Sequence, residues 1–217
     1  MLFSVDDLKA AIRIVLDQNM VSTQLITAND IDALSLEEII ESKIVDAARI
    51  VQRDAPARLL DGGTVFPAAS QVITWDSQAG YGPGSVPLPT DFLRLVCFKM
   101  SDWDHPVYTP IYEDSPMYAA QRSRFGGIRG NPQRPVVAIV MRSAGARLEF
   151  YSCAADTNAA VAEAAYIKMP VIDTGQIAIC EKLQPAVIHY AAYLAALNVG
   201  ETERAQAILQ AYNTLTR

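Results

Sequence analysis

Apolar side chains recur at helical spacing in the first 60 residues. Ser4 followed by Asp7 resembles a capping box, in which a hydroxyl and a carboxylate satisfy free N–H groups where a helix begins. The stripe behind it consists of Leu8, Ile12, Val15 and Leu16. Ser35 and Glu38 repeat the pattern before a second stripe that ends at Pro56. The pattern therefore predicts two helices, joined by a polar link through residues 27–30.

From residue 61 onwards the pattern changes to Gly and Pro punctuation between short β-rich runs, which is typical of strands. The predicted strands are Gln71–Trp75, Phe92–Met100, Pro106–Tyr112, Val136–Arg142, Arg147–Tyr151 and Tyr166–Met169. Two of them are separated by residues 143–146, a short Gly-containing link that favours a hairpin. Ser115 and Pro116 provide an N-cap and a first helical residue, so a short helix is expected near 116–124. Residues 125–135, rich in Gly, Pro and Arg, are interpreted as a mobile loop.

The last 40 residues return to helical spacing. A helix over 185–198 is rich in Ala and Tyr, Gly200 ends it, and a second stripe follows over 205–215. These two segments predict a closing pair of antiparallel helices. Four alanines lack bulk and would let a partner helix approach closely: Ala191, Ala192, Ala195 and Ala196.

The order of helices, strands and helices predicts the α+β class. We expect residues 1–60 and 176–217 to form one helical bundle and residues 61–175 to form a β-rich insertion, within one continuous structural unit. The 217 residues, 51% of them apolar, are enough for a sizeable core. The longest apolar run, within 186–197, is too short to span a bilayer, and the N-terminus lacks the pattern of a signal peptide. We therefore expect no membrane association and use in the cytoplasm or export by a non-secretory route.

Charge is spread unevenly along an acidic chain. The net charge is −6, and residues 1–62 hold eleven acids against six bases. Residues 115–148 hold six arginines and no acid. Those arginines are Arg122, Arg124, Arg129, Arg134, Arg142 and Arg147. An acidic protein is a poor ligand for DNA in solution, so this local cluster is the informative asymmetry.

Candidate chemistry is sparse. Cys97, Cys153 and Cys180 lack the spacing of a zinc or disulfide framework and are interpreted as buried apolar residues. His105 and His189 have no partner at metal-binding spacing, and the sequence contains neither a nucleophile elbow nor a phosphate-binding loop. We expect no catalytic residue, no metal and no cofactor, and hence no enzyme.

A resemblance appears in the central segment. It is carried by Leu88-Pro89-Thr90-Asp91-Phe92-Leu93-Arg94-Leu95, by Trp103 with Pro106-Val107, by Ser115-Pro116-Met117-Tyr118, by Gln133-Arg134-Pro135 and by Leu148-Glu149-Phe150-Tyr151. These segments resemble the head-to-tail connector, or neck ring, proteins of tailed bacteriophages, particularly the adaptors of short-tailed and crAss-like phages. By itself, the first segment also reads as an ordinary strand entry with alternating side chains.

The resemblance implies a virion structural protein, assembled in the host bacterial cytoplasm and located in the neck or tail. It implies a homo-oligomeric ring, commonly a dodecamer, that contacts the portal protein and other neck or tail rings. Genomic DNA would pass through the channel without sequence-specific binding.

In such a ring the arginines of the loop and its flank become a repeated belt of positive charge. Arg122, Arg124, Arg129 and Arg134 are the candidate contact residues, with side chains expected to reach outward. They could contact DNA phosphates, acidic residues of a neighbouring subunit, or only solvent. We favour the protein neighbour, because a channel that gripped DNA would oppose its ejection.

An alternative from another class is a ligand-binding or adhesion module. Trp75, Trp103, Tyr81 and Tyr112 of the β region would then serve as stacking aromatics. Burial of tryptophan in the core is the commoner outcome for such residues.

Overall fold

A computed structural model describes residues 1–16, 36–76, 83–123, 125–154 and 159–216, and it has the predicted α+β class. The chain divides into two compact units. The helical unit comprises Met1–Asp61 and Met169–Arg217, and the β-rich unit comprises Gly62–Lys168. Residues 169–175, which we expected in the β-rich insertion, thus belong to the helical unit.

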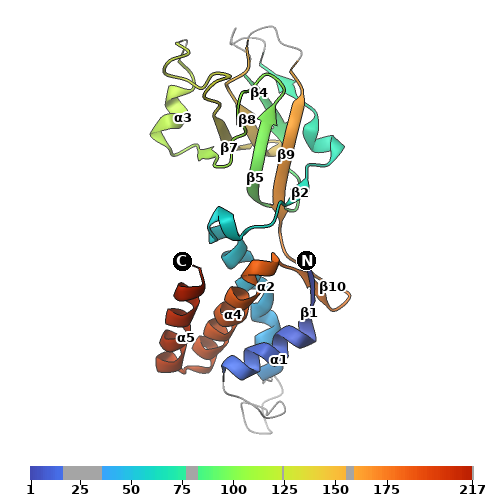
Figure 1. Cartoon of the computed structure of the whole chain (residues 1–217), viewed down its shortest axis with the longest axis vertical. Helices are drawn as coiled ribbons and strands as arrows, with labels where there is room; N and C mark the ends of the chain where they lie inside the picture. Colours follow the sequence, from blue (N-terminus) through green and yellow to red (C-terminus); the bar gives the residue numbers. More distant parts are fainter. Residues whose placement is uncertain (17–35, 77–82, 124, 155–158, 217) are drawn as a thin grey trace. The chain divides into compact units, whose positions relative to one another are not determined.

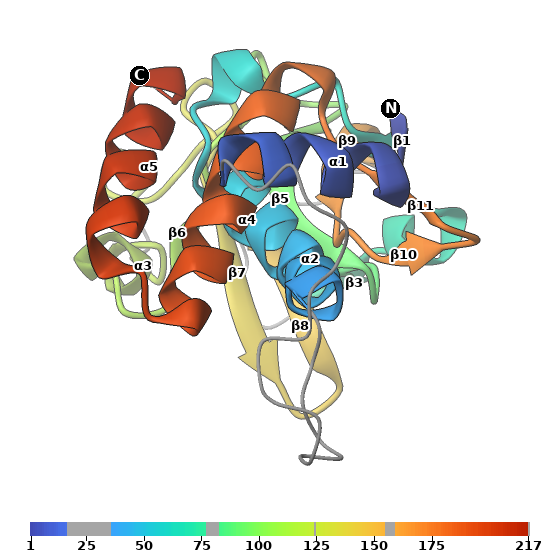
Figure 2. The ribbon, with the colours of Figure 1, turned by 90° about the horizontal axis from the view of Figure 1, so that it is seen from below.

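The helical unit is built around one central helix. The helices among its described residues are α1 (Val5–Val15), α2 (Leu36–Asp54), α4 (Gln184–Val199) and α5 (Thr202–Leu215). Helix α4 packs against the other three (Figure 2). Two short 3₁₀ turns, Ala57–Leu59 and Glu181–Leu183, lie in the same unit.

The predicted helix ends are confirmed where they are described. The Ser4 hydroxyl accepts a hydrogen bond from the Asp7 N–H at 3.5 Å and so caps α1. Gly200 ends α4 with φ 83°, a left-handed conformation that glycine adopts without a Cβ clash. The N-cap predicted at Ser35 and the polar link at 27–30 lie outside the described residues.

A small antiparallel sheet completes the helical unit. Its strand order is β1 (Leu2–Ser4), β11 (Gln176–Ala178) and β10 (Ile172–Asp173). The last two strands form a hairpin that extends from the unit (Figure 1). Strands of two or three residues are too short to produce an alternating pattern, so our sequence reading did not predict this sheet.

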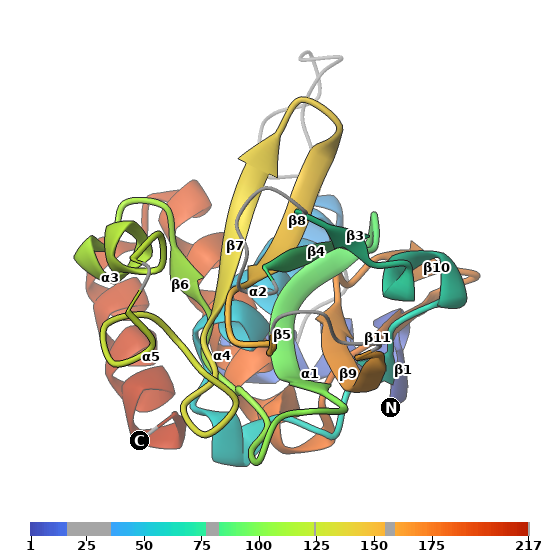
Figure 3. The same cartoon turned by 90° about the horizontal axis from the view of Figure 1, so that it is seen from above.

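The β-rich unit contains two sheets (Figure 3). One has the order β2 (Thr64–Val65), β9 (Val161–Lys168) and β5 (Phe92–Met100). The other has the order β3 (Thr74–Trp75), β4 (Gly84–Pro87), β8 (Gly145–Phe150), β7 (Val137–Arg142) and β6 (Ile111–Tyr112). Only the β6–β7 pair is parallel among these strands.

Aromatic rings fill the space between the two sheets. Phe98 of β5 stacks on Phe150 of β8 with ring centres 5.8 Å apart. Trp103 meets both rings edge-on, at 5.8 and 6.2 Å. Phe66 packs against Tyr166 of β9 at 5.3 Å. Because these rings come from both sheets, they form one apolar core for the unit.

The predicted strands agree with the structure to different degrees. Phe92–Met100 matches β5 in full, and the hairpin between Arg142 and Gly145 is confirmed. Strand β9 begins five residues earlier than predicted, and the run at 71–75 yields only the two-residue β3. Ser115 caps the short helix α3 (Pro116–Ala120) by accepting from the Met117 N–H, as predicted, but α3 ends four residues early.

Candidate functional site

The arginine-containing loop at 125–135, interpreted from its sequence as mobile, has a defined set of internal hydrogen bonds. The Asn131 carboxamide organises it. Its Oδ1 accepts from the N–H groups of Gln133 and Arg134, both at 3.0 Å, and its Nδ2 donates to the Gly126 carbonyl at 2.9 Å. An asparagine that bonds its own turn in this way holds a Gly- and Pro-rich segment in one conformation.

Gly130 anchors the loop to Gln121 at the end of α3 and lies close to Ser152. Its N–H donates to the buried Gln121 side chain at 2.8 Å. A Cβ at this position would lie 2.3 Å from Ser152 Oγ, so no larger residue fits without movement. The Ser152 hydroxyl is itself engaged, because it accepts from the Val136 N–H at 2.8 Å.

Arg129 contradicts the expectation that the loop arginines all reach outward. Its guanidinium donates to the carbonyl oxygens of Tyr151 at 3.0 Å and Gly130 at 3.3 Å. The folded loop turns this side chain toward the sheet, where carbonyl groups at the end of β8 need donors. Arg129 therefore supports the loop rather than presenting charge to a partner.

Two of the other candidate arginines are exposed. Arg122 follows α3, and its guanidinium lies 5.9 Å from the centre of the Tyr118 ring, within cation–π range. Arg134 is exposed at the end of the turn that Asn131 organises. Arg124 lies outside the described residues.

Arg142, at the tip of the β7–β8 hairpin, is bound by two carboxylates. Its Nη1 donates to Glu113 Oε1 and its Nη2 donates to Glu149 Oε1, each at 2.6 Å. Nη2 also donates to the Tyr118 hydroxyl at 2.8 Å, and the Tyr151 hydroxyl donates to the other oxygen of Glu149. We call these five side chains the Arg142 network.

The sequence reading missed this network because both acids flank the acid-free stretch. Glu113 precedes it and Glu149 follows it directly. Strand alternation could have predicted the contact between Arg142 and Glu149. With the turn of the hairpin placed at 143–144, both residues lie on the same face. Arg147 is also engaged, because it donates to Ser85 Oγ at 3.0 Å and to Thr74 Oγ1 at 2.9 Å.

The network shifts the acidity of its members. The Met141 N–H and the Arg142 guanidinium lower the pKa of Glu113 from its ordinary value. Burial, followed by the hydrogen bond to Glu149, raises the pKa of Tyr151. Both shifts move the pKa further from neutral pH, so Glu113 stays charged and Tyr151 stays protonated over a wider pH range, which suits a structural role.

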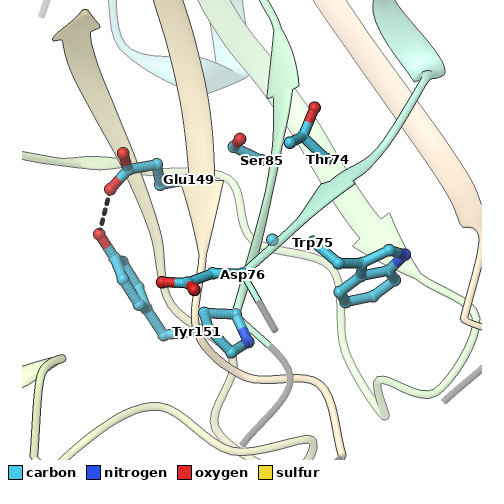
Figure 4. Close-up of a pocket in the computed structure, with 8 residues that line it drawn as sticks. Thr74, Trp75, Asp76, Ser85, Glu149 and Tyr151 are labelled. Carbon is cyan, nitrogen blue, oxygen red and sulfur yellow. Dashed lines mark hydrogen bonds between the residues drawn. The ribbon is translucent and has the colours of Figure 1, made fainter. Parts of the chain in front are cut away.

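A pocket beside the network bears on the ligand-binding alternative. It measures about 170 Å³ and is lined by residues of β3, β4 and β8, including Trp75, Asp76, Glu149 and Tyr151. In Figure 4 the Trp75 ring points away from the Glu149 and Tyr151 side chains. Typical small-molecule sites hold roughly 300–1,000 Å³, so this pocket is small for that role.

The aromatic residues of that alternative do not gather around one site. Trp103 is 3% exposed in the core, and Tyr112 is exposed on β6. Trp75 packs edge-on against Phe150, with ring centres 5.6 Å apart. Tyr81 lies outside the described residues. The described aromatics therefore give no support to a stacking site.

The Leu-Pro-Thr-Asp-Phe segment has a structural role at the entry to β5. Asp91 accepts a hydrogen bond from the Tyr166 hydroxyl at 2.7 Å and lies 3.6 Å from Lys168 Nζ. Phe92 stacks on the Tyr166 ring, with centres 5.9 Å apart. Burial and Asp91 raise the pKa of Tyr166 to about 12, so this hydroxyl stays a donor. Asp91 and Phe92 thereby tie β5 to β9.

The residues considered for chemistry are placed as follows. All three cysteines are buried, and burial raises the pKa of the Cys97 thiol to about 11. His189 Nδ1 lies 2.8 Å from the Pro185 carbonyl, within its own helix. Among the described residues, no group of three His, Cys, Asp or Glu side chains could hold a metal ion. No helix of the described chain has the length and apolar character needed to cross a membrane.

The four alanines singled out in the sequence lie in α4. Ala191, Ala192 and Ala195 are 0% exposed and Ala196 is 1% exposed. They face neighbours on several sides, because α4 packs against α1, α2 and α5. That these positions require small side chains stays a prediction.

The architecture is a helical unit into which a β-rich unit is inserted, with a folded arginine loop and an ion-paired network at the surface. Such surfaces suit contacts with other proteins. The sequence profile of the SU10 adaptor protein family matches residues 3–217, and the chain belongs to this family. No curated protein matches the chain. The predicted resemblance is confirmed at the level of the family: the chain is a phage structural adaptor, a virion component that interacts with other head or tail proteins.

Proposed function

We propose that the chain is the subunit of a homo-oligomeric ring, commonly twelvefold, that connects the portal to the tail and surrounds the DNA channel. The observation that carries this proposal is the family match over nearly the whole chain. Large apolar side chains exposed in both units support it, among them Ile14, Val72, Phe125 and Ile128 at 60–73% exposure. Apolar groups of this size favour burial against a partner.

Assembly on a portal tests the proposal. The purified chain should be mixed with the portal protein of the same phage, and complexes should be sized by light scattering and viewed by negative-stain microscopy. We expect rings on the portal, even if the chain alone is monomeric. A chain that stays monomeric beside assembled portals would overturn the proposal.

Within this function, we assign the exposed arginines of the β-rich unit to a protein neighbour. Arg122 and Arg134 remain exposed, whereas Arg129 and Arg142 are bound within their own unit. A fitting partner is the acidic surface of α1 and α2 in a neighbouring subunit, where Asp6 is 90% exposed in its side chain. Opposite charges on facing surfaces steer association and select partners.

Charge reversal separates the three possible roles of these arginines. Arg122→Glu combined with Arg134→Glu should impair neck assembly, and lysine at Asp6 and Asp46 of the partner surface should restore part of it. The matched control is Arg58→Glu with Lys182→Glu, two exposed bases of the helical unit. Virions that assemble normally but retain DNA poorly would favour the channel instead. Normal assembly with normal DNA retention would leave only a solvated loop.

A further inference from the structure

The outer face of α5 has an unusual composition for a solvent-exposed helix. Its exposed residues from the second turn onward include Gln206, Ala207, Gln210 and Thr214, which we call the α5 face. From Ala205 to Thr216 the helix carries no charged side chain. Exposed helix surfaces of soluble proteins are normally rich in charge, whereas the centres of protein interfaces are depleted of it.

A second surface of the helical unit also has few charged side chains. The strand register places Leu2, Asp173, Gln176 and Ala178 on one face of the small sheet, and all four are exposed. Ile177 points to the opposite side and is fully buried. The exposed set, which we call the outer sheet face, holds one charge and includes Leu2 at 63% exposure.

The strand edge that borders the outer sheet face is complementary to the α5 face in hydrogen bonding. Strand β10 is at the edge of its sheet, and its outer side has no strand partner among the described residues. Such an edge offers backbone N–H donors and C=O acceptors together. The carboxamides of Gln206 and Gln210 also provide both donor and acceptor, so they can satisfy a strand edge without bringing in charge.

The positions of the two surfaces suit a closed ring. Within the helical unit, α5 and the small sheet lie on opposite sides of α4 in both Figure 1 and Figure 2. A ring of identical subunits needs two different surfaces on each copy, which meet head to tail. Surfaces on opposite sides of one compact unit meet that requirement, whereas a symmetric dimer would use one surface twice.

We propose that the outer sheet face of one copy binds the α5 face of the next copy around the ring. This inference rests on the proposed ring and names the contact that closes it. The occupant of each surface is therefore a second copy of this chain.

The first test places charge in the α5 face. Ala207→Glu with Gln210→Glu should reduce the yield of portal-bound rings by about tenfold or more, because unpaired carboxylates resist burial at an interface. Helix content measured by circular dichroism should stay at the wild-type value, since both positions are exposed. The matched control is Ala68→Glu with Ala69→Glu, which adds the same charge at exposed positions of the β-rich unit and should assemble normally.

The second test restores the charge balance across the contact. Adding Gln176→Lys and Ala178→Lys to the α5 double variant should recover ring formation, because each outer sheet face then meets the carboxylates of the next copy. Wild-type assembly by the α5 double variant, or no recovery with the lysines, would overturn this contact while the ring itself stands. Failure of the wild-type chain to form any ring on the portal would overturn the proposed function and this contact together.

Discussion

In the helical unit the most central element is α4, whose buried side chains are mainly alanines, whereas the β-rich unit is filled by phenylalanine, tryptophan and tyrosine rings. Alanines at 0–1% exposure let helix backbones approach closely, so α4 itself contributes little side-chain volume, and α1 and α2 supply the large apolar groups of the helical core, such as Ile12 and Ile44. The aromatic core joins two sheets through a few large groups. We therefore expect α4 to be sensitive to added atoms and the aromatic core to removed ones.

The two units also differ in where their charged side chains lie and what these side chains contact. Helix α4 contains no charged residue, and the charged residues of α5 are confined to its first turn. The β-rich unit instead places Arg142 in contact with two carboxylates, and Arg129 and Arg147 against carbonyl and hydroxyl oxygens. Charge in the β-rich unit thus fixes loops and a hairpin, whereas α4 and the part of α5 beyond its first turn pack through uncharged side chains.

Removal of a ring from the aromatic core should have the largest effect. Phe98→Ala should lower the free energy of unfolding by about 3–5 kcal/mol, because Phe98 is fully buried between Phe66, Trp103 and Phe150. Both tryptophans belong to the β-rich unit, so tryptophan fluorescence during urea unfolding reports on this unit.

The control is Tyr108→Ala, which removes an aromatic ring that is 62% exposed. Circular dichroism at 222 nm follows the four long helices, which all belong to the helical unit. If both signals shift by the same amount in Phe98→Ala, the two units unfold as one and the contrast between them fails.

Added bulk in α4 should have the next largest effect. Ala192→Leu or Ala195→Leu should cost about 1–3 kcal/mol, because both positions are fully buried against neighbouring helices. The loss should appear in the 222 nm transition. Ala10→Leu, at an exposed position of α1, is the control and should change stability little. Wild-type stability of both α4 variants would mean that this helix is not closely packed.

A methyl group at Gly130 tests whether the arginine loop is held as tightly as the α4 core. Gly130→Ala should cost about 1–3 kcal/mol in the fluorescence transition, since its Cβ would collide with Ser152 Oγ. Gly127→Ala lies in the same loop with nothing within 4 Å of the new atom, so it should be neutral. Equal stability of the two variants would show that the loop yields easily.

The sequence predicted the parts of the fold that have a sustained pattern of apolar positions or a clear signal at the end of a helix or strand. The α1 cap at Ser4, the whole of β5, the β7–β8 hairpin and the stop at Gly200 all depend on local chemistry and are confirmed. The small sheet was missed because its strands are too short to show alternation and because the paired residues Leu2 of β1 and Ala178 of β11 are 176 residues apart. Pairing over that distance is decided by tertiary packing.

The candidate site was predicted less well, for a related reason. A cluster of arginines is visible in the sequence, but the partners of each guanidinium are set by the fold. Arg129 turns inward because Gly130 and Asn131 shape its loop, and Arg142 meets Glu113 only because β6 lies beside β7. A run of like charge in the sequence therefore overstated the free positive charge of the β-rich unit.

The smallest expected effect concerns the Arg142 network at the tip of the β7–β8 hairpin. The Glu113 side chain is 39% exposed, and solvent screens its ion pair with Arg142. Because its pKa is lowered in the folded chain, the charged carboxylate favours folding. That contribution is present above the pKa of an unfolded glutamate, about 4.3, and is lost as pH falls through the lower pKa of the folded state. Glu113→Gln should therefore lower stability slightly at pH 7, and the difference from wild type should decrease as the pH is lowered from about 4 toward about 3. Urea unfolding followed by tryptophan fluorescence at pH 7 and at about pH 3 measures this difference.

Asp114→Asn removes the same charge at the neighbouring exposed position and is the control. A difference between Glu113→Gln and wild type that is as large at pH 3 as at pH 7 would show that the Glu113 carboxylate does not stabilise the hairpin through its charge.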